Sequence, residues 1–169
     1  MPVDRATFRD LAGAFPSGVA IVTTVDAHGA PRGLTSQAFI GLSTEPPLVL
    51  VSLDRASRTL AALRQSGLFV VNVLKGGSED LSTRFATKAD DKFQGVRWIP
   101  SNVARGAPIL VDAANAFLEC TVAEVIEQGD HVMFVGSVEG GRVLGGPPLL
   151  YYRRTYAAWP EETPAPPVL

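Results

Sequence analysis

Short apolar segments alternate with turn-forming residues along most of this chain, and they are rich in β-branched residues, as strands are. The segments that read as β-strands lie at residues 18–26, 32–43, 48–54, 68–74, 115–128 and 131–143. The turn at 27–31 and the tight turn around Gly129 and Asp130 predict that the strands flanking each turn pair as antiparallel hairpins.

Three short segments follow helical spacing instead, at residues 4–15, 57–67 and 78–86. In the first, Asp4 precedes an apolar face that is formed by Phe8, Leu11, Ala12 and Phe15. Ser57 is typical of a helix start and Gly67 of a helix end. We therefore expect an amphipathic opening helix and two short helices later in the chain.

The rest of the chain contains one long irregular segment and a short tail. Residues 87–108 are rich in Gly, Pro and Asn, and irregular segments of this length usually carry function. Residues 159–169 are rich in Pro and acidic residues, which predicts a disordered or surface-lying tail after a single domain at 1–158. Strands joined by hairpins, with helices that do not alternate with them, predict a mainly β fold: a closed antiparallel barrel with a few appended short helices.

Composition and charge narrow the class of protein. With 169 residues the chain fits one domain, and it is 46% hydrophobic without an apolar run long enough to span a membrane. The first ten residues do not resemble a targeting signal, so we expect a water-soluble, cytoplasmic protein. A net charge of −2 indicates no general attraction to nucleic acid or to an anionic membrane.

The side chains suited to catalysis are few. His28 and His131 are the two histidines, and Cys120 is the one cysteine, so we expect no transition-metal site and no disulfide within the chain. Cys120 lies in a predicted strand, which favours a buried, inert thiol. No GxSxG, phosphate-loop or GxGxxG motif is present. An enzyme without reactive side chains of its own usually depends on a cofactor.

The segment LDRASRT at 53–59 is the first candidate ligand site. A strand leads there into a helix start that carries the hydroxyls of Ser57 and Thr59 beside Arg58, which suits a phosphate group. The simpler alternative, in which Ser57 only caps the helix, is favoured by these residues taken alone.

Three other segments suggest contacts with a flat ligand or a second ligand. In GLTSQAF, at 33–39, small and polar residues interrupt a strand, as they would beneath a planar group or at an edge-strand bulge. His131 follows a turn, where it either contacts a ligand or only caps the hairpin. The segment LLYYRRTY at 149–156 mixes tyrosines and arginines that could stack on rings and pair with phosphates, or could simply form a packed final strand.

The order of these segments, from Phe8 to Tyr156, resembles the flavin reductase family of the FMN-binding split barrel, whose members are reductase partners of two-component flavin monooxygenases. The resemblance is carried by FRDLAGAFPSGVAIVTT, GLTSQAF, EPPLVLVSLDRASRTL, FVVNVL, STRFA, DDKFQGV, FLECTV, GDHVMFVGSV and PPLLYYRRTY. It implies a homodimer of six-stranded antiparallel Greek-key barrels that hold flavin in a groove near the subunit interface.

The resemblance also implies roles for individual residues. The phosphate-binding Ser-x-Thr of the family falls on Ser57 and Thr59, with Arg58 able to screen the phosphate. His131 matches a residue near the nicotinamide. The remaining implied flavin-pocket residues are Ser17, Thr35, Ser36, Gln37, Ala38, Phe85, Ala86, Tyr152 and Arg153. Members commonly carry Asn or Ser where this chain has Gln37, which leaves the preference for FMN or FAD open.

The implied activity is transfer of a hydride from NADH or NADPH to FMN or FAD, with the reduced flavin supplied to a separate monooxygenase. Two alternatives stay open: a flavoprotein that retains FMN and reduces a substrate directly, and a flavin-binding dimer without catalytic activity. The sequence does not distinguish NADH from NADPH, since recognition of the 2′-phosphate can depend on a single loop arginine.

Overall fold

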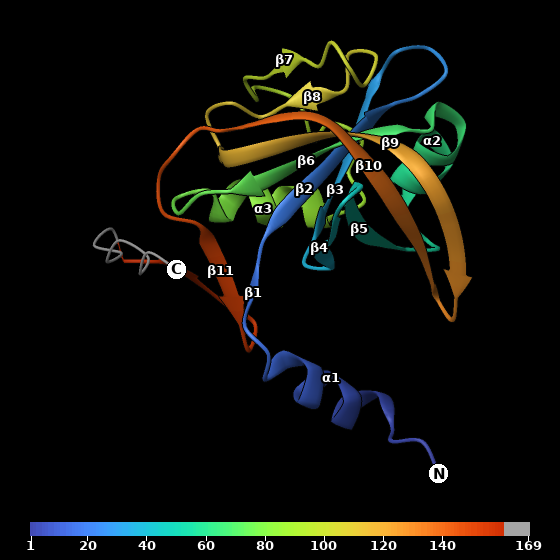
Figure 1. Ribbon diagram of the computed structural model, residues 1–169. Helices are drawn as coiled ribbons and strands as arrows, with labels where there is room; N and C mark the ends of the chain where they lie inside the picture. Colours follow the sequence, from blue (N-terminus) through green and yellow to red (C-terminus); the bar gives the residue numbers. More distant parts are fainter. Residues whose placement is uncertain (161–169) are drawn as a thin grey trace.

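The computed structural model describes residues 1–160, and most of the predicted tail at 159–169 lies outside the described residues. The main sheet is antiparallel, with the strand order β3-β2-β6-β9-β10-β5-β4 (Figure 1). Its strands are β2 (Ala20–Val25), β3 (Pro31–Ser36), β4 (Phe39–Thr44), β5 (Pro47–Asp54), β6 (Leu68–Leu74), β9 (Ala114–Gln128) and β10 (His131–Val143).

The smaller elements surround this sheet. The helices found within residues 1–160 are α1 (Arg5–Gly13), α2 (Arg58–Ser66) and α3 (Glu79–Ala86). A small sheet joins β1 (Ser17–Gly18), β11 (Leu149–Tyr152) and β12 (Thr155–Ala158), and a two-stranded one joins β7 (Ile99–Pro100) to β8 (Pro108–Ile109). The predicted mainly β, antiparallel fold with short helices is therefore confirmed.

The main sheet has seven strands where six were predicted, because the segment expected as one strand at 32–43 is divided. β3 pairs with β2, and β4 pairs with β5 on the opposite edge of the sheet. The change of partner occurs at Gln37 and Ala38, where Ser36 Oγ accepts a hydrogen bond from the Ala38 amide at 3.1 Å. As β3 and β4 are the two edge strands, the hydrogen bonds of residues 1–160 do not describe a closed barrel.

The C-terminal segment also changes direction. For residues 149–156 the sequence left open a packed final strand or contacts with a ligand, and in the structure they turn back at Arg153 and Arg154 and form the hairpin of β11 and β12. Both arginines have positive φ, 45° and 67°, which is the backbone of a two-residue type I′ turn.

The core of the sheet holds the helices and hairpins in place. Every residue of β2 is buried, as are the large side chains Leu53, Phe69 and Phe134 from other strands. Gly136 lies directly over the Phe69 ring, and its lack of a side chain makes room for this ring against β10. This packing fixes β5, which leads into α2, and β6, which precedes α3. It also fixes β10, whose first residue pairs with the end of β5.

Helix α1 extends away from the sheet (Figure 1). Asp4 Oδ1 accepts a hydrogen bond from the Thr7 amide at 2.8 Å, so the predicted N-cap is confirmed. No residue of α1 is buried, and Phe8, Leu11 and Phe15 are 61%, 63% and 78% exposed. The amphipathic helix therefore forms as predicted, but its apolar face has no partner within residues 1–160.

None of the helices between residues 1 and 160 is both long enough and apolar enough to cross a membrane.

Candidate functional site

A cavity of about 230 Å³ lies between β3, the turn before α2 and the end of α3. It brings together residues that are far apart in the chain. The predicted site residues among its lining are Thr35, Ser57, Arg58, Phe85 and Ala86. Further lining residues that the sequence did not single out are Leu34, Asp54, Ala56, Thr87, Lys88 and Lys92.

The start of α2 forms one wall of this cavity. Ser57 Oγ accepts a hydrogen bond from the Thr59 amide at 3.3 Å, so Ser57 caps the helix as predicted. Thr59 is buried and lines a smaller neighbouring hollow rather than the cavity itself. The cap and the ligand contact are compatible roles for Ser57, because a hydroxyl oxygen that accepts one bond keeps its own proton to donate.

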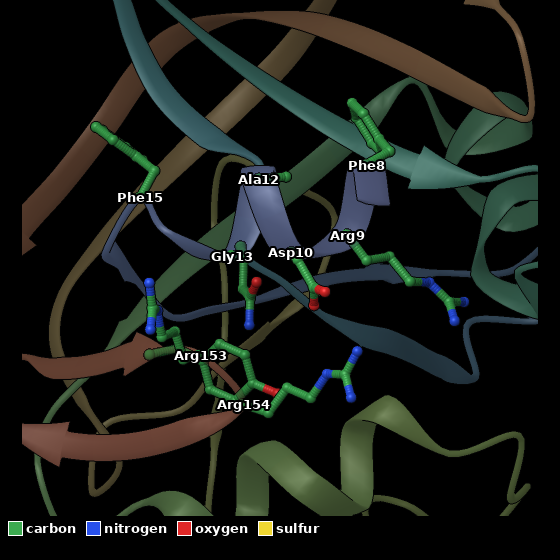
Figure 2. Close-up of a pocket in the computed structure, with 10 residues that line it drawn as sticks. Phe8, Arg9, Asp10, Ala12, Gly13, Phe15, Arg153 and Arg154 are labelled. Carbon is green, nitrogen blue, oxygen red and sulfur yellow. The ribbon is translucent and has the colours of Figure 1, made fainter. Parts of the chain in front are cut away.

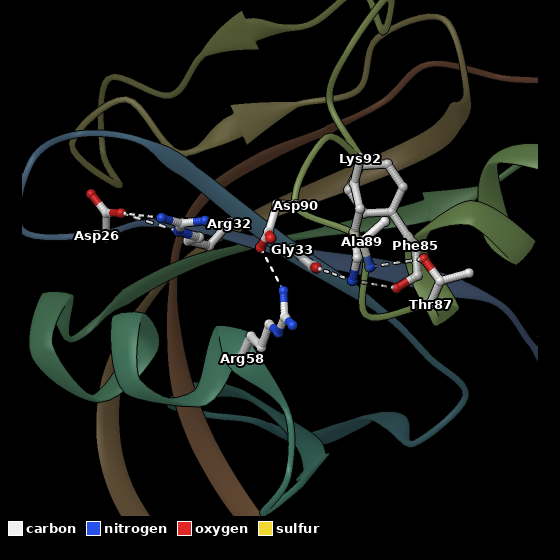
Figure 3. Close-up of polar contacts among 9 residues, drawn as sticks. All are labelled: Asp26, Arg32, Gly33, Arg58, Phe85, Thr87, Ala89, Asp90 and Lys92. Atoms are coloured by element: carbon white, nitrogen blue, oxygen red, sulfur yellow. Dashed lines mark hydrogen bonds and ion pairs between the residues drawn. The ribbon is translucent and has the colours of Figure 1, made fainter.

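Three cationic side chains face this cavity: Arg58, Lys88 and Lys92. Arg58 forms an exposed ion pair with Asp90 at 2.6 Å (Figure 3). Lys92 Nζ donates to the carbonyl oxygen of Gly33 at 3.2 Å and to that of Phe85 at 3.0 Å. These bonds tie the irregular segment after α3 to β3, which places a positive charge at the cavity wall.

The pKa of Lys92 lies below its ordinary value of 10.5. Partial burial is the main cause, since it disfavours the charged ammonium, and the positive charge of Arg58 acts in the same direction. Asp90 opposes this shift. A bound anion in the cavity would stabilise the protonated form of Lys92.

Close packing beneath the cavity explains one of the small residues in the segment 33–39. Phe85 is fully buried, and its ring meets the Phe93 ring edge-on with the centroids 4.8 Å apart. A Cβ atom at Gly33 would lie 3.0 Å from Phe85 Cε1 and 3.2 Å from Phe93 Cζ. Gly33 therefore lets α3 approach β3 closely enough to form the cavity wall.

Residues 35–38 run from this cavity to a larger one. Thr35 Oγ1 donates to the Ser82 carbonyl at 2.6 Å, and buried Ser36 Oγ donates to the Ser52 carbonyl at 3.3 Å. Gln37 and Ala38 form the bend between β3 and β4, with Gln37 exposed. The polar residues at 35 and 36 thus hold the backbone in place, which leaves Gln37 free for an outside contact.

The larger cavity, of about 830 Å³, lies between α1, Gln37 and the β11–β12 turn (Figure 2). Its lining residues are Phe8, Arg9, Asp10, Ala12, Gly13, Phe15, Gln37, Tyr151, Arg153 and Arg154. Of the predicted site residues, Gln37 and Arg153 lie here. Tyr152 is exposed next to it with the Arg153 guanidinium carbon 5.5 Å from its ring centroid, and Ser17 pairs with Tyr151 between β1 and β11.

His131 lines neither cavity. It is the first residue of β10 and lies opposite Asp54, which lines the smaller cavity. Its Nδ1 is 2.7 Å from Asp130 Oδ1, and this hydrogen bond is the main cause that lowers the pKa of Asp130. His131 is thus held at the rim of the site by the neighbouring carboxylate.

Two features of the described residues limit the chemistry. Among residues 1–160, no three His, Cys, Asp or Glu side chains cluster so that they could hold a metal ion. Cys120 is buried, and burial raises the pKa of its thiol to about 12, so the predicted inert cysteine is confirmed. The buried Cys120 thiol is therefore not a nucleophile for a ligand, whereas the cationic side chains that line the smaller cavity suit an anionic one.

Residues 12–160 match the family model described as "Flavin reductase like domain". Among curated proteins, "Flavin reductase (NADH)" of Kitasatospora aureofaciens is 46% identical over 166 residues, covering 95% of this chain and 84% of that protein. The "Flavin-dependent monooxygenase, reductase subunit HsaB" of Mycobacterium tuberculosis is 41% identical over 165 residues, covering 95% of this chain and 86% of that protein.

A solved structure shows a similar arrangement of the backbone. The NADH:FAD oxidoreductase SgcE6 of Streptomyces globisporus, in complex with NAD and FAD fragments, is 31% identical and has a TM-score of 0.87. The similarity covers 94% of this chain and 94% of that one.

Proposed function

Because this chain belongs to the flavin reductase-like domain family and is an NAD(P)H:flavin oxidoreductase, we propose that its smaller cavity binds the phosphate end of FMN or FAD. The observation that carries this proposal is the convergence of the α2 start with Arg58, Lys88 and Lys92 in one cavity that adjoins residues 35–38. The flavin ring then extends along residues 35–38 toward the larger cavity.

The residues of the cavity fit an anionic phosphate. The positive end of a helix contributes about 0.3 to 1 kcal/mol toward an anion, so α2 alone is a weak anchor. Arg58, Lys88 and Lys92 supply charge-assisted bonds in addition, and Ser57 supplies a hydroxyl. Since FMN and FAD both carry a phosphate at this position, the cavity accommodates either cofactor.

The chain's own residues bind the flavin and the nicotinamide and orient them. A bound flavin supplies the acceptor for a hydride from the nicotinamide, which no side chain of this protein could replace. Thr35 and Ser36 hold the backbone beneath the ring through their bonds to Ser82 and Ser52. Gln37 presents an amide to the polar edge of the ring, and Phe85 and Ala86 form the apolar side of the pocket.

The nicotinamide is oriented from the rim of the site. The His131 side chain is about half exposed, and its Nδ1 is bonded to Asp130, which leaves Nε2 for a ligand. We infer that this nitrogen contacts the nicotinamide nucleotide and that Ser17 of β1, with Tyr152 and Arg153 of the β11–β12 hairpin, completes the pocket.

The reduced flavin is the product that passes to a separate monooxygenase. The similar HsaB protein is named as the reductase subunit of such an enzyme, which supports a partner of the same kind for this chain. An open, solvent-accessible site suits a flavin that binds and leaves in each cycle.

The proposed assembly is a homodimer of six-stranded Greek-key split barrels. Counting β3 and β4 as one strand, bent at Gln37 and Ala38, makes the main sheet six-stranded and joins its two edges. The part of the exposed apolar face of α1 that lies outside the larger cavity, at Leu11, is the surface that a second copy would cover.

A spectrophotometric assay with each nicotinamide and each flavin tests the function. We expect NAD(P)H oxidation that rises with added FMN or FAD and saturates. A yellow purified protein whose rate does not depend on added flavin would instead indicate a flavoprotein that retains its FMN. Flavin binding without NAD(P)H oxidation would indicate a binding protein and would refute the proposed activity.

A further inference from the structure

The turn between β11 and β12 contains two arginines in a backbone conformation that suits glycine. Arg153 and Arg154 have φ of 45° and 67°, in the left-handed region where a Cβ atom is disfavoured. Type I′ turns of this kind usually use Asn and Gly. A side chain kept in such a conformation is a reason to look for a function that requires it.

The charged groups around this turn indicate that the function is to bind an anion. Both arginines line the larger cavity together with Arg9 and Asp10 of α1, and Arg154 extends on the side of Arg9 and Asp10 (Figure 2). Neither Arg9, Arg153 nor Arg154 forms an ion pair with any residue among 1–160. The cavity therefore presents three guanidinium groups and one carboxylate, an excess of positive charge that an anionic ligand would neutralise.

The turn is also held in place. The Arg153 amide donates to the Gly13 carbonyl at the end of α1, at 3.4 Å. The Tyr151 ring packs against Tyr156, whose hydroxyl is 3.0 Å from Ser82 Oγ. Because Arg153 lies over the Tyr152 ring, Arg154 is the arginine of this turn whose guanidinium has neither an ion pair nor an aromatic partner among residues 1–160.

We propose that Arg154, with Arg9 beside it, binds a phosphate group of the nicotinamide dinucleotide and so makes the larger cavity the second substrate's site. The inference rests on the proposed function, in which the flavin ring extends along residues 35–38 and Gln37 opens onto this cavity. A volume of about 830 Å³ is in the range of sites for ligands of this size. A planar guanidinium group suits a phosphate because it can donate two parallel hydrogen bonds to two phosphate oxygens.

The test compares Arg154→Gly with Arg105→Gly. Arg105 also has a positive φ, 47°, but it is exposed in a turn that belongs to neither cavity. Both substitutions relieve the same kind of backbone strain, so both variants should keep a Tm close to or above that of the unsubstituted protein. Only Arg154→Gly removes a group from the proposed phosphate site.

Steady-state kinetics should separate the two variants. Arg154→Gly should raise the KM for NADH, NADPH or both about tenfold, as expected for loss of a charge-assisted bond, with kcat and the flavin Kd unchanged. The KM for 1-benzyl-1,4-dihydronicotinamide, which carries no phosphate, should not change. Calorimetric titration with NAD⁺ and NADP⁺ should show the same loss: an effect on NADP⁺ alone identifies the 2′-phosphate, and an effect on both identifies the diphosphate.

Several results would overturn the proposal. One is an unchanged KM for both dinucleotides in Arg154→Gly, and another is an equal change for the phosphate-free compound. A changed sedimentation coefficient would show that the turn contacts a second copy of the chain instead. These outcomes are distinct from failure of the proposed function, which would appear as an unsubstituted protein that does not oxidise NAD(P)H when flavin is added.

Discussion

At the scale of single residues, Lys92 connects the architecture to the chemistry of the site. Its two bonds to carbonyl oxygens fix the segment after α3, and its third N–H remains for a ligand. Because burial and Arg58 lower its pKa, the charge that would bind a phosphate is lost at a lower pH than for an exposed lysine.

We predict that FMN affinity depends on the protonation of Lys92. A bound phosphate favours the ammonium form, so FMN affinity should be constant from about pH 7, where the phosphate is doubly ionised, up to the lowered pKa of Lys92 and should fall as pH rises through it. Lys92→Met should weaken FMN binding about tenfold near neutral pH and abolish this fall. Fluorescence titration with FMN, and with riboflavin as the ligand without a phosphate, measures both effects.

Lys75→Met is the matched control, since Lys75 lines neither cavity. In the ligand-free protein, the free energy of unfolding should change with pH in the opposite direction to FMN affinity. Between the lowered folded pKa of Lys92 and its unfolded value the unfolded chain binds more protons, so the free energy of unfolding rises with pH there. An FMN affinity that has the same pH profile in Lys92→Met would contradict the assignment.

His131 provides a second prediction at this scale. His131→Ala should raise the KM for the nicotinamide nucleotide while it leaves the flavin Kd unchanged, since the side chain lies at the rim and lines neither cavity. His28→Ala is the control, because His28 lies in the exposed turn between β2 and β3. Equal KM values for His131→Ala and the unsubstituted protein would remove His131 from the site.

At the scale of elements, close approaches between strands and helices set the shape of the site. Gly33 lets Phe85 pack against β3, and Gly136 lets Phe69 and Cys120 pack against β10. A Cβ atom at Gly136 would lie 2.9 Å from Phe69 Cε1, 3.1 Å from Cys120 Cβ and closer still to Phe69 Cζ. The ring and its neighbours are fully buried, so little room exists for them to move.

We predict that Gly136→Ala lowers the free energy of unfolding by about 1 to 3 kcal/mol through overpacking. Gly41→Ala in edge strand β4 should change it by less than about 0.5 kcal/mol, since a Cβ atom there meets no atom within 4 Å. Urea unfolding followed by fluorescence compares the two variants. Equal stability of both would mean that the β10 packing can relax around the added methyl group.

Element prediction succeeded where the determining contacts are local and failed where they are distant. The start and end of α2 follow from Ser57 and Gly67, whose capping bonds lie within a few residues of each. The segment 32–43 was expected as one strand interrupted by small and polar residues, but its two halves pair with different strands, β2 and β5. No pattern within the segment itself distinguishes these partners, so the division at Gln37 was not predicted.

At the scale of the whole molecule, the apolar face of α1 has no packing partner within residues 1–160. Phe8 and Phe15 line the larger cavity, whereas Leu11 is exposed outside it. A helix whose large apolar side chains are all exposed gains no stability from packing within its own chain. We infer that a second copy supplies the missing contact.

The corresponding prediction is that Leu11→Glu shifts the protein from dimer to monomer. A charge placed in an apolar interface would leave a carboxylate without a partner, so the dimer Kd should rise at least tenfold. Val143→Glu is the control, since Val143 is 79% exposed at the end of β10. Sedimentation velocity measures the result, and an unchanged sedimentation coefficient for Leu11→Glu would exclude α1 from the interface.

The sequence by itself determined the local features of this protein. Strand segments, hairpin turns, helix caps and the buried cysteine all depend on neighbouring residues, and the order of the motifs was sufficient to indicate the family. The candidate phosphate residues Ser57 and Arg58 were found in the same way, because they mark a helix start.

Only the tertiary structure decided which distant residues share a cavity. Lys88 and Lys92 lie about thirty residues after the α2 start, in an irregular segment, and both line the same cavity as Ser57 and Arg58. The bonds of Lys92 to the Gly33 and Phe85 carbonyls help to fix this segment, and no local pattern encodes the bond to Gly33. Arg154 lies across the larger cavity from α1 because the chain turns back at a type I′ turn, which the sequence analysis did not predict. Local patterns specify which elements form, but the charge gathered in each cavity depends on how those elements pack.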